Sequence, residues 1–92
     1  MTNSLDTRTV TVTVRYFAGA KAAAGQGSEP VSVPAGTTVA ALVEAIASDH
    51  GEALVKVLAA SSFLLDGTAV HSRDEALADG AVLDVLPPFA GG

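Results

Sequence analysis

The segment TVTVTVRY at residues 9–16 alternates apolar with polar side chains, and it constrains the fold more than any other part of the chain. Successive side chains of a β-strand point to opposite faces, so this period of two predicts a strand with one buried face. Further along, apolar residues recur at i, i+3, i+4 and i+7, which predicts a helix with one apolar face. The residues of that face are Val39, Leu42, Val43 and Ile46. A sheet with this main helix across one face is an α+β fold.

The other expected elements are short and are bounded by turn residues. Thr38 is the expected N-cap of the main helix, and Gly51 is its expected end. The small residues 18–24 are able to form a helical turn or two before Gly25. The remaining predicted elements are an edge strand at 30–34, a second helix at 52–60, strands at 62–65, 68–72 and 81–86, and a turn of helix at 74–80. Together they predict a mixed sheet.

The chain length fits a single domain with a small core. We expect residues 1–8 to be a disordered leader, residues 9–86 to be the folded domain, and residues 87–92 to be an extended C-terminal tail. Ten acidic residues against five basic ones give a formal charge of −5, which repels phosphate backbones and anionic lipids. Nucleic acid and membrane are therefore poor partners, and a basic protein surface is a better one.

Cysteine is absent, which excludes disulfides, thiolate metal sites and cysteine nucleophiles. The polar N-terminal residues have neither the apolar core of a signal peptide nor the length of a membrane span. The expected location is therefore cytoplasmic.

No group of side chains is arranged for catalysis by its neighbours in the sequence. His50 and His71 lie far apart, and neither has the spacing of a metal ligand. The glycines near Lys21 fit neither a phosphate-binding loop nor a dinucleotide-binding turn, and Ser61 and Ser62 lack a glycine elbow. We therefore expect no enzymatic activity from the chain by itself, no metal site and no bound cofactor.

The chain ends in LPPFAGG, and the order of these residues points to a tail that is presented to another protein. Pro87 and Pro88 remove two backbone donors and fix two φ angles, so the chain leaves the sheet as an extended spacer. Phe89 offers an apolar grip, and Gly91 and Gly92 have no Cβ to obstruct a narrow channel. The reactive group would then be the terminal carboxylate. A frayed end without a function is the alternative.

These features resemble the MoaD/ThiS family of sulfur carriers. The resemblance rests on VRYFAGAKAAAG, PAGTTVAALVEAI and LADGAVLDVLPPFAGG, and it extends from Val10 to Gly92. It implies the ubiquitin-like β-grasp fold, with a mixed sheet, one main helix across one face and a flexible C-terminal Gly-Gly tail. Within the family, the PPFAGG ending is most similar to the small subunit of molybdopterin synthase.

The resemblance also implies a chemistry in which Gly92 is the covalent site. A MoeB-like enzyme would adenylate its carboxylate with ATP, and a sulfur donor would convert it to a thiocarboxylate. The tail would then enter a MoaE-like large subunit and give its sulfur to cyclic pyranopterin monophosphate, in molybdenum cofactor biosynthesis. All catalytic side chains would belong to the partners. The channel residues would be Gly91 and Ala90, and the partner-binding residues would be Phe89, Pro88, Pro87 and Leu86.

Three other functions remain open at this point. The first is a sulfur carrier for thiazole or cysteine synthesis, which would share the chemistry of Gly92 and differ in its partner. The second is a ubiquitin-like protein modifier, whose terminus would form an isopeptide bond to lysine. The third is an interaction module whose tail is idle.

Overall fold

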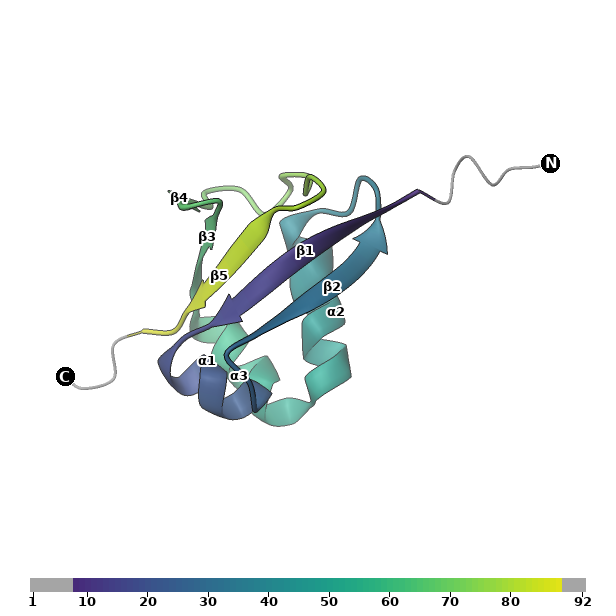
Figure 1. Ribbon diagram of the computed structural model, residues 1–92. Coiled ribbons are helices and arrows are strands. Elements are labelled where there is room, and N and C mark those ends of the chain that lie inside the picture. The colour runs from purple at the N-terminus through teal and green to yellow at the C-terminus, as the bar shows by residue number, and fades with distance from the viewer. Residues whose placement is uncertain (1–7, 89–92) are drawn as a thin grey trace.

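The computed structural model describes residues 8–88, so residues 1–7 of the expected leader and residues 89–92 of the expected tail lie outside the described residues. Figure 1 shows one sheet with helices packed behind it. From the N-terminus the elements are β1 (Thr9–Tyr16), α1 (Ala18–Ala24), β2 (Ser28–Pro34), α2 (Val39–His50), α3 (Glu52–Ala60), β3 (Ser62–Leu65), β4 (Thr68–Ala69) and β5 (Val82–Leu86).

The sheet is mixed, and its strand order is β2-β1-β5-β3-β4. β1 and β2 form an antiparallel hairpin, with Val12 opposite Val31. β5 then inserts beside β1 in parallel, with Val14 opposite Leu83, and β3 pairs antiparallel with the other edge of β5. The first and last strands of the chain therefore lie side by side in the middle of the sheet.

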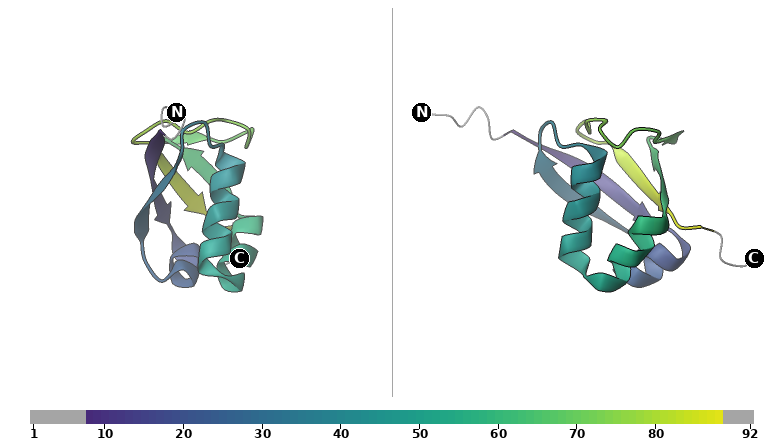
Figure 2. Two further views of the ribbon diagram at one scale, coloured as in Figure 1. Left: turned by 90° about the vertical axis from the view of Figure 1, so that its right-hand side faces the viewer. Right: turned by 180° about the vertical axis from the view of Figure 1, so that it is seen from behind.

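In the part of the chain that the structure describes, all three helices pack on the same face of the sheet, and no helix covers the other face (Figure 2). The core lies between these two layers, and the predicted alternation of β1 holds because Val12 and Val14 are completely buried. The predicted face of α2 is also buried, and Leu42 has no exposed surface. The α+β fold and the mixed sheet are thus confirmed. Within residues 8–88, no helix is long and apolar enough to cross a bilayer.

The predicted turn of helix at 74–80 is wrong, because this segment has a turn at each end and a stretch between them that passes the start of α2 without forming a helix. The first backbone N–H groups of a helix have no partner within it. Here the amides of Val39 and Ala40 donate to the carbonyls of Glu75 and Arg73, at 3.0 and 2.9 Å. The segment also forms a β-bridge between Thr38 and Ala76. Helical geometry at 74–80 would turn these carbonyls away from α2.

The predicted boundaries of α2 are confirmed. The hydroxyl of Thr38 accepts a hydrogen bond from the amide of Ala41 at 3.2 Å, which is the geometry of an N-cap. At the other end, Gly51 has a φ of +98°, a conformation that side chains other than glycine rarely adopt. α2 therefore stops at His50, and α3 starts directly after the glycine.

The short strands end in turns that side chains support. β4 covers Thr68–Ala69, after a turn at Asp66 and Gly67, and is shorter than the predicted strand at 68–72. Asp66 adopts a φ of +50°, and its carboxylate accepts a hydrogen bond from the amide of Val82 at 2.9 Å. This contact fixes the start of β5, which begins at Val82.

A polar network ties the edge strand β2 to the end of α2. The hydroxyl of Tyr16 donates to Oε2 of Glu29 at 2.5 Å, and Nε2 of His50 lies 2.5 Å from the same oxygen. Burial raises the pKa of the Glu29 carboxyl, but the hydrogen bonds from Tyr16 and His50 lower it further, so its pKa lies below the ordinary value. Burial, with the nearby charge of Glu29, raises the pKa of the Tyr16 hydroxyl. The tyrosine therefore stays a donor.

This network predicts a loss of stability in acid. The pKa of Glu29 in the folded state lies below its unfolded value near 4.5, so its contribution is fully present above about pH 4.5 and is lost as the pH falls through the folded-state pKa. Urea unfolding in a metal-free buffer, between pH 7 and pH 3, measures this loss. We expect Glu29→Gln to flatten the profile. Glu44→Gln removes an exposed carboxylate of α2 as the control, and equal flattening by both variants would contradict the prediction.

Candidate functional site

The tail leaves the sheet from the end of its central strand. β5 pairs with β1 on one side and with β3 on the other, and Leu86 at its end lies opposite Ser62 of β3. Because β5 runs parallel to β1, the C-terminal ends of both strands lie at the same end of the sheet. Figure 1 shows the chain leaving the sheet there. The fold therefore gives the tail a rigid base that is held on both sides.

The structure places part of the predicted site at this edge. Leu86 and Pro87 are half-buried, and Pro88 is exposed. The other predicted site residues lie outside the described residues: Phe89, Ala90, Gly91 and Gly92. Their roles in the channel and in sulfur chemistry stay predictions.

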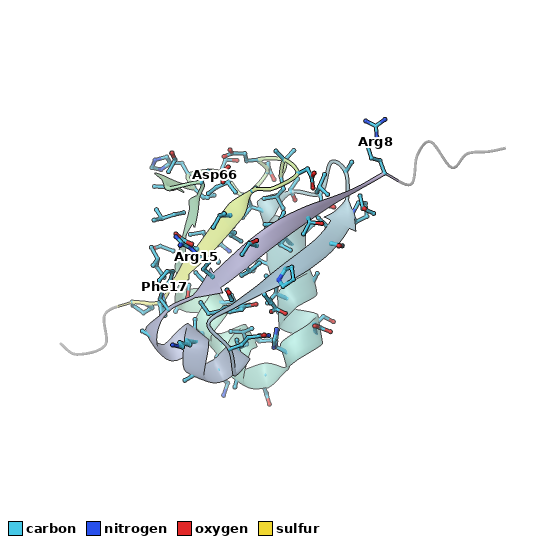
Figure 3. All side chains as sticks on the ribbon, in the orientation of Figure 1. Arg8, Arg15, Phe17 and Asp66 are labelled. Carbon is cyan, nitrogen blue, oxygen red and sulfur yellow. The ribbon has the colours of Figure 1, made fainter. Side chains whose placement is uncertain are left out.

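Phe17 is a surface residue at the same edge that the sequence analysis did not single out. Tyr16 lies opposite Val85, so Phe17 follows β1 beside the point where the tail begins. The side chain of Phe17 is 39% exposed, and Figure 3 shows it at the start of the tail. Its carbonyl accepts the amide of Ala20 at the start of α1, which holds the backbone in place. One signal in the sequence could have identified Phe17. It is aromatic, yet the alternation of β1 places it on the same side as Arg15, which faces away from the core.

An ion pair holds the outer face of the sheet together next to Phe17. Nε and Nη2 of Arg15 donate to the two carboxylate oxygens of Asp84, at 2.6 and 2.9 Å. The side chain of Asp84 is 8% exposed and that of Arg15 is 52% exposed, so only the guanidinium faces solvent. The hydrogen bond to Asp84 and its charge raise the pKa of Arg15 above its ordinary value. Figure 3 shows Arg15 on the face that has no helix over it.

Apolar side chains gather at the end of the sheet where the tail begins. We call them the exit surface and define it as Phe17, Leu64, Leu86, Pro87 and Pro88. Leu64 lies opposite Asp84 in the β3–β5 pair, so it shares the outer face with Leu86. The guanidinium carbon of Arg15 lies 5.7 Å from the centre of the Phe17 ring, and so adds a cation to an apolar surface. Apolar side chains around a positive charge are typical of a protein-docking surface.

Comparison with protein families shows which family this chain belongs to. The ThiS family matches residues 14–92, which span most of the described domain and the whole tail. The chain belongs to the ThiS family. The resemblance to the MoaD/ThiS family is thereby confirmed, as is the ubiquitin-like β-grasp fold. A search of curated protein sequences gives no significant match.

Solved structures of similar proteins agree with this assignment. A protein described as a candidate molybdopterin converting factor, subunit 1, from Pyrococcus furiosus is 34% identical, with a TM-score of 0.78, and covers 87% of this chain and 99% of its own. SAMP1 from Haloferax volcanii is 28% identical, with a TM-score of 0.78, and covers 89% and 99%. A complex of subunits 1 and 2 of the Helicobacter pylori molybdopterin-converting factor is 28% identical, with a TM-score of 0.63, and covers 90% and 100%. This ThiS-family chain is therefore similar both to subunits of a converting factor and to a modifier protein.

Proposed function

We propose that this protein is a sulfur carrier and the small subunit of a molybdopterin synthase, which donates sulfur from a thiocarboxylate at Gly92. The main support is the similarity to subunit 1 of the molybdopterin-converting factors, one of which is solved together with subunit 2. The ThiS-family match also extends to Gly92, so it includes the whole tail.

The chemistry of the tail requires partners. A terminal carboxylate has an ordinary pKa of roughly 3.3–3.7 and is ionised at neutral pH, so it is a poor electrophile. A MoeB-like enzyme with ATP converts it to an acyl-adenylate and releases pyrophosphate. A sulfur donor then attacks the acyl carbon and displaces AMP, which leaves the thiocarboxylate. A MoaE-like large subunit supplies the side chains that transfer this sulfur to cyclic pyranopterin monophosphate.

The described residues suit this role because the base of the tail lies next to a candidate docking surface. The exit surface includes the base of the tail, so a partner bound there receives the tail in a fixed direction. Pro87 and Pro88 then keep the chain extended as it leaves the sheet. The ion pair between Arg15 and Asp84 holds β1 to β5 beside this surface.

Replacing Phe17 tests the exit surface as the docking surface. We expect Phe17→Ala to speed dissociation from the large subunit about tenfold or more, because truncating an aromatic anchor acts mainly on the dissociation rate. Surface plasmon resonance with an immobilised large subunit measures this rate. Val55→Ala is the matched control, since Val55 is 43% exposed but lies on α3, in the helical layer. Equal rates for wild type and Phe17→Ala would place the interface elsewhere.

A second candidate function is a ubiquitin-like protein modifier. It is favoured by SAMP1, for which a second structure carries the name small archaeal modifier protein 1. In that function the carboxylate of Gly92 forms an isopeptide bond with a lysine amine of another protein. A sulfur carrier for thiazole or cysteine synthesis shares the loading step and differs in the acceptor.

Mass spectrometry of the protein from its native cells separates these functions. A carrier gains the mass that corresponds to exchange of one oxygen for sulfur. A modifier appears, after digestion with trypsin, as residues 74–92 attached to lysines of other proteins, because Arg73 is the last tryptic site before Gly92. Molybdopterin formation from the loaded protein, the large subunit and cyclic pyranopterin monophosphate supports the proposed pathway. A loaded protein that gives no molybdopterin would assign the sulfur to another pathway.

A further inference from the structure

A cluster of titratable side chains lies where β2 passes the end of α2, on the side of the sheet that the helices cover. Glu29 comes from β2, and Asp49 and His50 come from α2. One ligand atom of each residue lies within 4.8 Å of those of the other two. The exit surface is on the outer face of the sheet, so this cluster is separate from the proposed docking surface.

The protein holds two of these three side chains in place. Tyr16 is 2% exposed, and its hydroxyl binds Oε2 of Glu29 at 2.5 Å. The ring of Tyr16 also meets the ring of His50 edge to face, with the centres 6.0 Å apart. Groups that hydrogen-bond to or pack on metal ligands fix their orientation in known metal sites. Glu29 therefore has a hydrogen bond that orients it, and the His50 ring is held by packing against Tyr16.

A hollow beside the cluster leaves room for further ligands. Its volume is about 230 Å³, and both Glu29 and Asp49 line it. A cation between the three side chains would thus meet open solvent, and water could complete its coordination. The two carboxylates also match the charge of a divalent ion.

We propose that Glu29, Asp49 and His50 form a binding site for a divalent transition-metal cation of the Zn²⁺ type. An imidazole nitrogen with two carboxylate oxygens is a ligand set that Zn²⁺ accepts, whereas Mg²⁺ prefers oxygen ligands alone. The bound ion links β2 to the end of α2, in place of the direct contact between Glu29 and His50. This site departs from our expectation of no metal ligands, which rested on spacing along the chain.

Titration of the tag-free, full-length protein with zinc chloride tests the site. Competition with a chromophoric chelator measures the affinity and the number of ions bound. We expect one Zn²⁺ per chain, and roughly tenfold or greater loss of affinity in Asp49→Asn and in His50→Gln. The matched controls are His71→Gln and Asp74→Asn, which make the same changes at exposed positions and are expected to bind like wild type.

The two site variants separate ligation from a structural role. His50→Gln also removes the contact with Glu29, so it can loosen α2, whereas Asp49 is exposed and its replacement by asparagine keeps the shape of the side chain. Wild-type affinity in Asp49→Asn and His50→Gln would overturn the proposal. Equal binding of Mg²⁺ and Zn²⁺ by the wild-type protein would also overturn it, because that result indicates general attraction to an acidic surface.

Discussion

Deletion of Gly92 is expected to abolish sulfur loading and to leave the stability of the fold unchanged. The deletion shortens the extended tail by about 3.3–3.6 Å, which moves its carboxylate out of reach of the activating phosphate. β5 ends at Leu86, so no strand residue is removed. Incubation with the adenylating enzyme, ATP and a sulfur donor, followed by intact-mass measurement, gives the loaded fraction. We expect this fraction to fall below detection.

Two further changes test separate requirements of the same tail. Gly91→Val adds a branched side chain that obstructs a close-fitting channel, and we expect it to prevent loading. A C-terminal tag converts the carboxylate of Gly92 into an internal amide, so no acyl-adenylate can form. The same tag at the N-terminus is the control and is expected to load normally. Molybdopterin formation by an untrimmed, C-terminally tagged protein would exclude the carrier function and favour an interaction module.

Leu42→Ala is expected to lower the free energy of unfolding by about 2–5 kcal/mol. Leu42 has no exposed surface and lies in the core between α2 and the sheet. Its truncation removes buried apolar surface and leaves a cavity that the packed core fills only in part. Urea unfolding followed by circular dichroism measures the change.

The control for Leu42 is a truncation on the exposed side of the same helix. Glu44 is exposed on α2, so we expect Glu44→Ala to change the free energy of unfolding by no more than about 0.5 kcal/mol. A loss below about 1 kcal/mol in Leu42→Ala would mean that this face of α2 contributes little to the core.

The sequence predicts the two layers of this fold because their periods are long and regular. The valines of β1 and the apolar face of α2 recur often enough to fix which sides are buried. The segment at 74–80 fails for a physical reason, since its backbone carbonyls accept hydrogen bonds from Val39 and Ala40 of α2. The residue pattern within 74–80 contains no information about these hydrogen bonds, because their donors lie in a distant part of the sequence.

The candidate site also has one part that the sequence predicts and another that it does not. The properties of the tail can be predicted from the sequence, because proline and glycine affect the backbone at their own positions. The exit surface cannot be predicted from the sequence, because Phe17 and Leu86 come close together only when β5 pairs with β1. The contact between Glu29 and His50 likewise joins two elements that are separate in the sequence.

The central position of β5 also governs when the sheet can assemble. The β1–β2 hairpin and the β3–β4 hairpin share no pairing of their own, and β5 joins them. β5 is the last element to be synthesised, and pairing between distant segments is a slow step in folding. A chain that stops before Val82 thus lacks both the joined sheet and the tail. Pairing of β5 therefore completes the sheet and, in the same step, fixes the base of the tail.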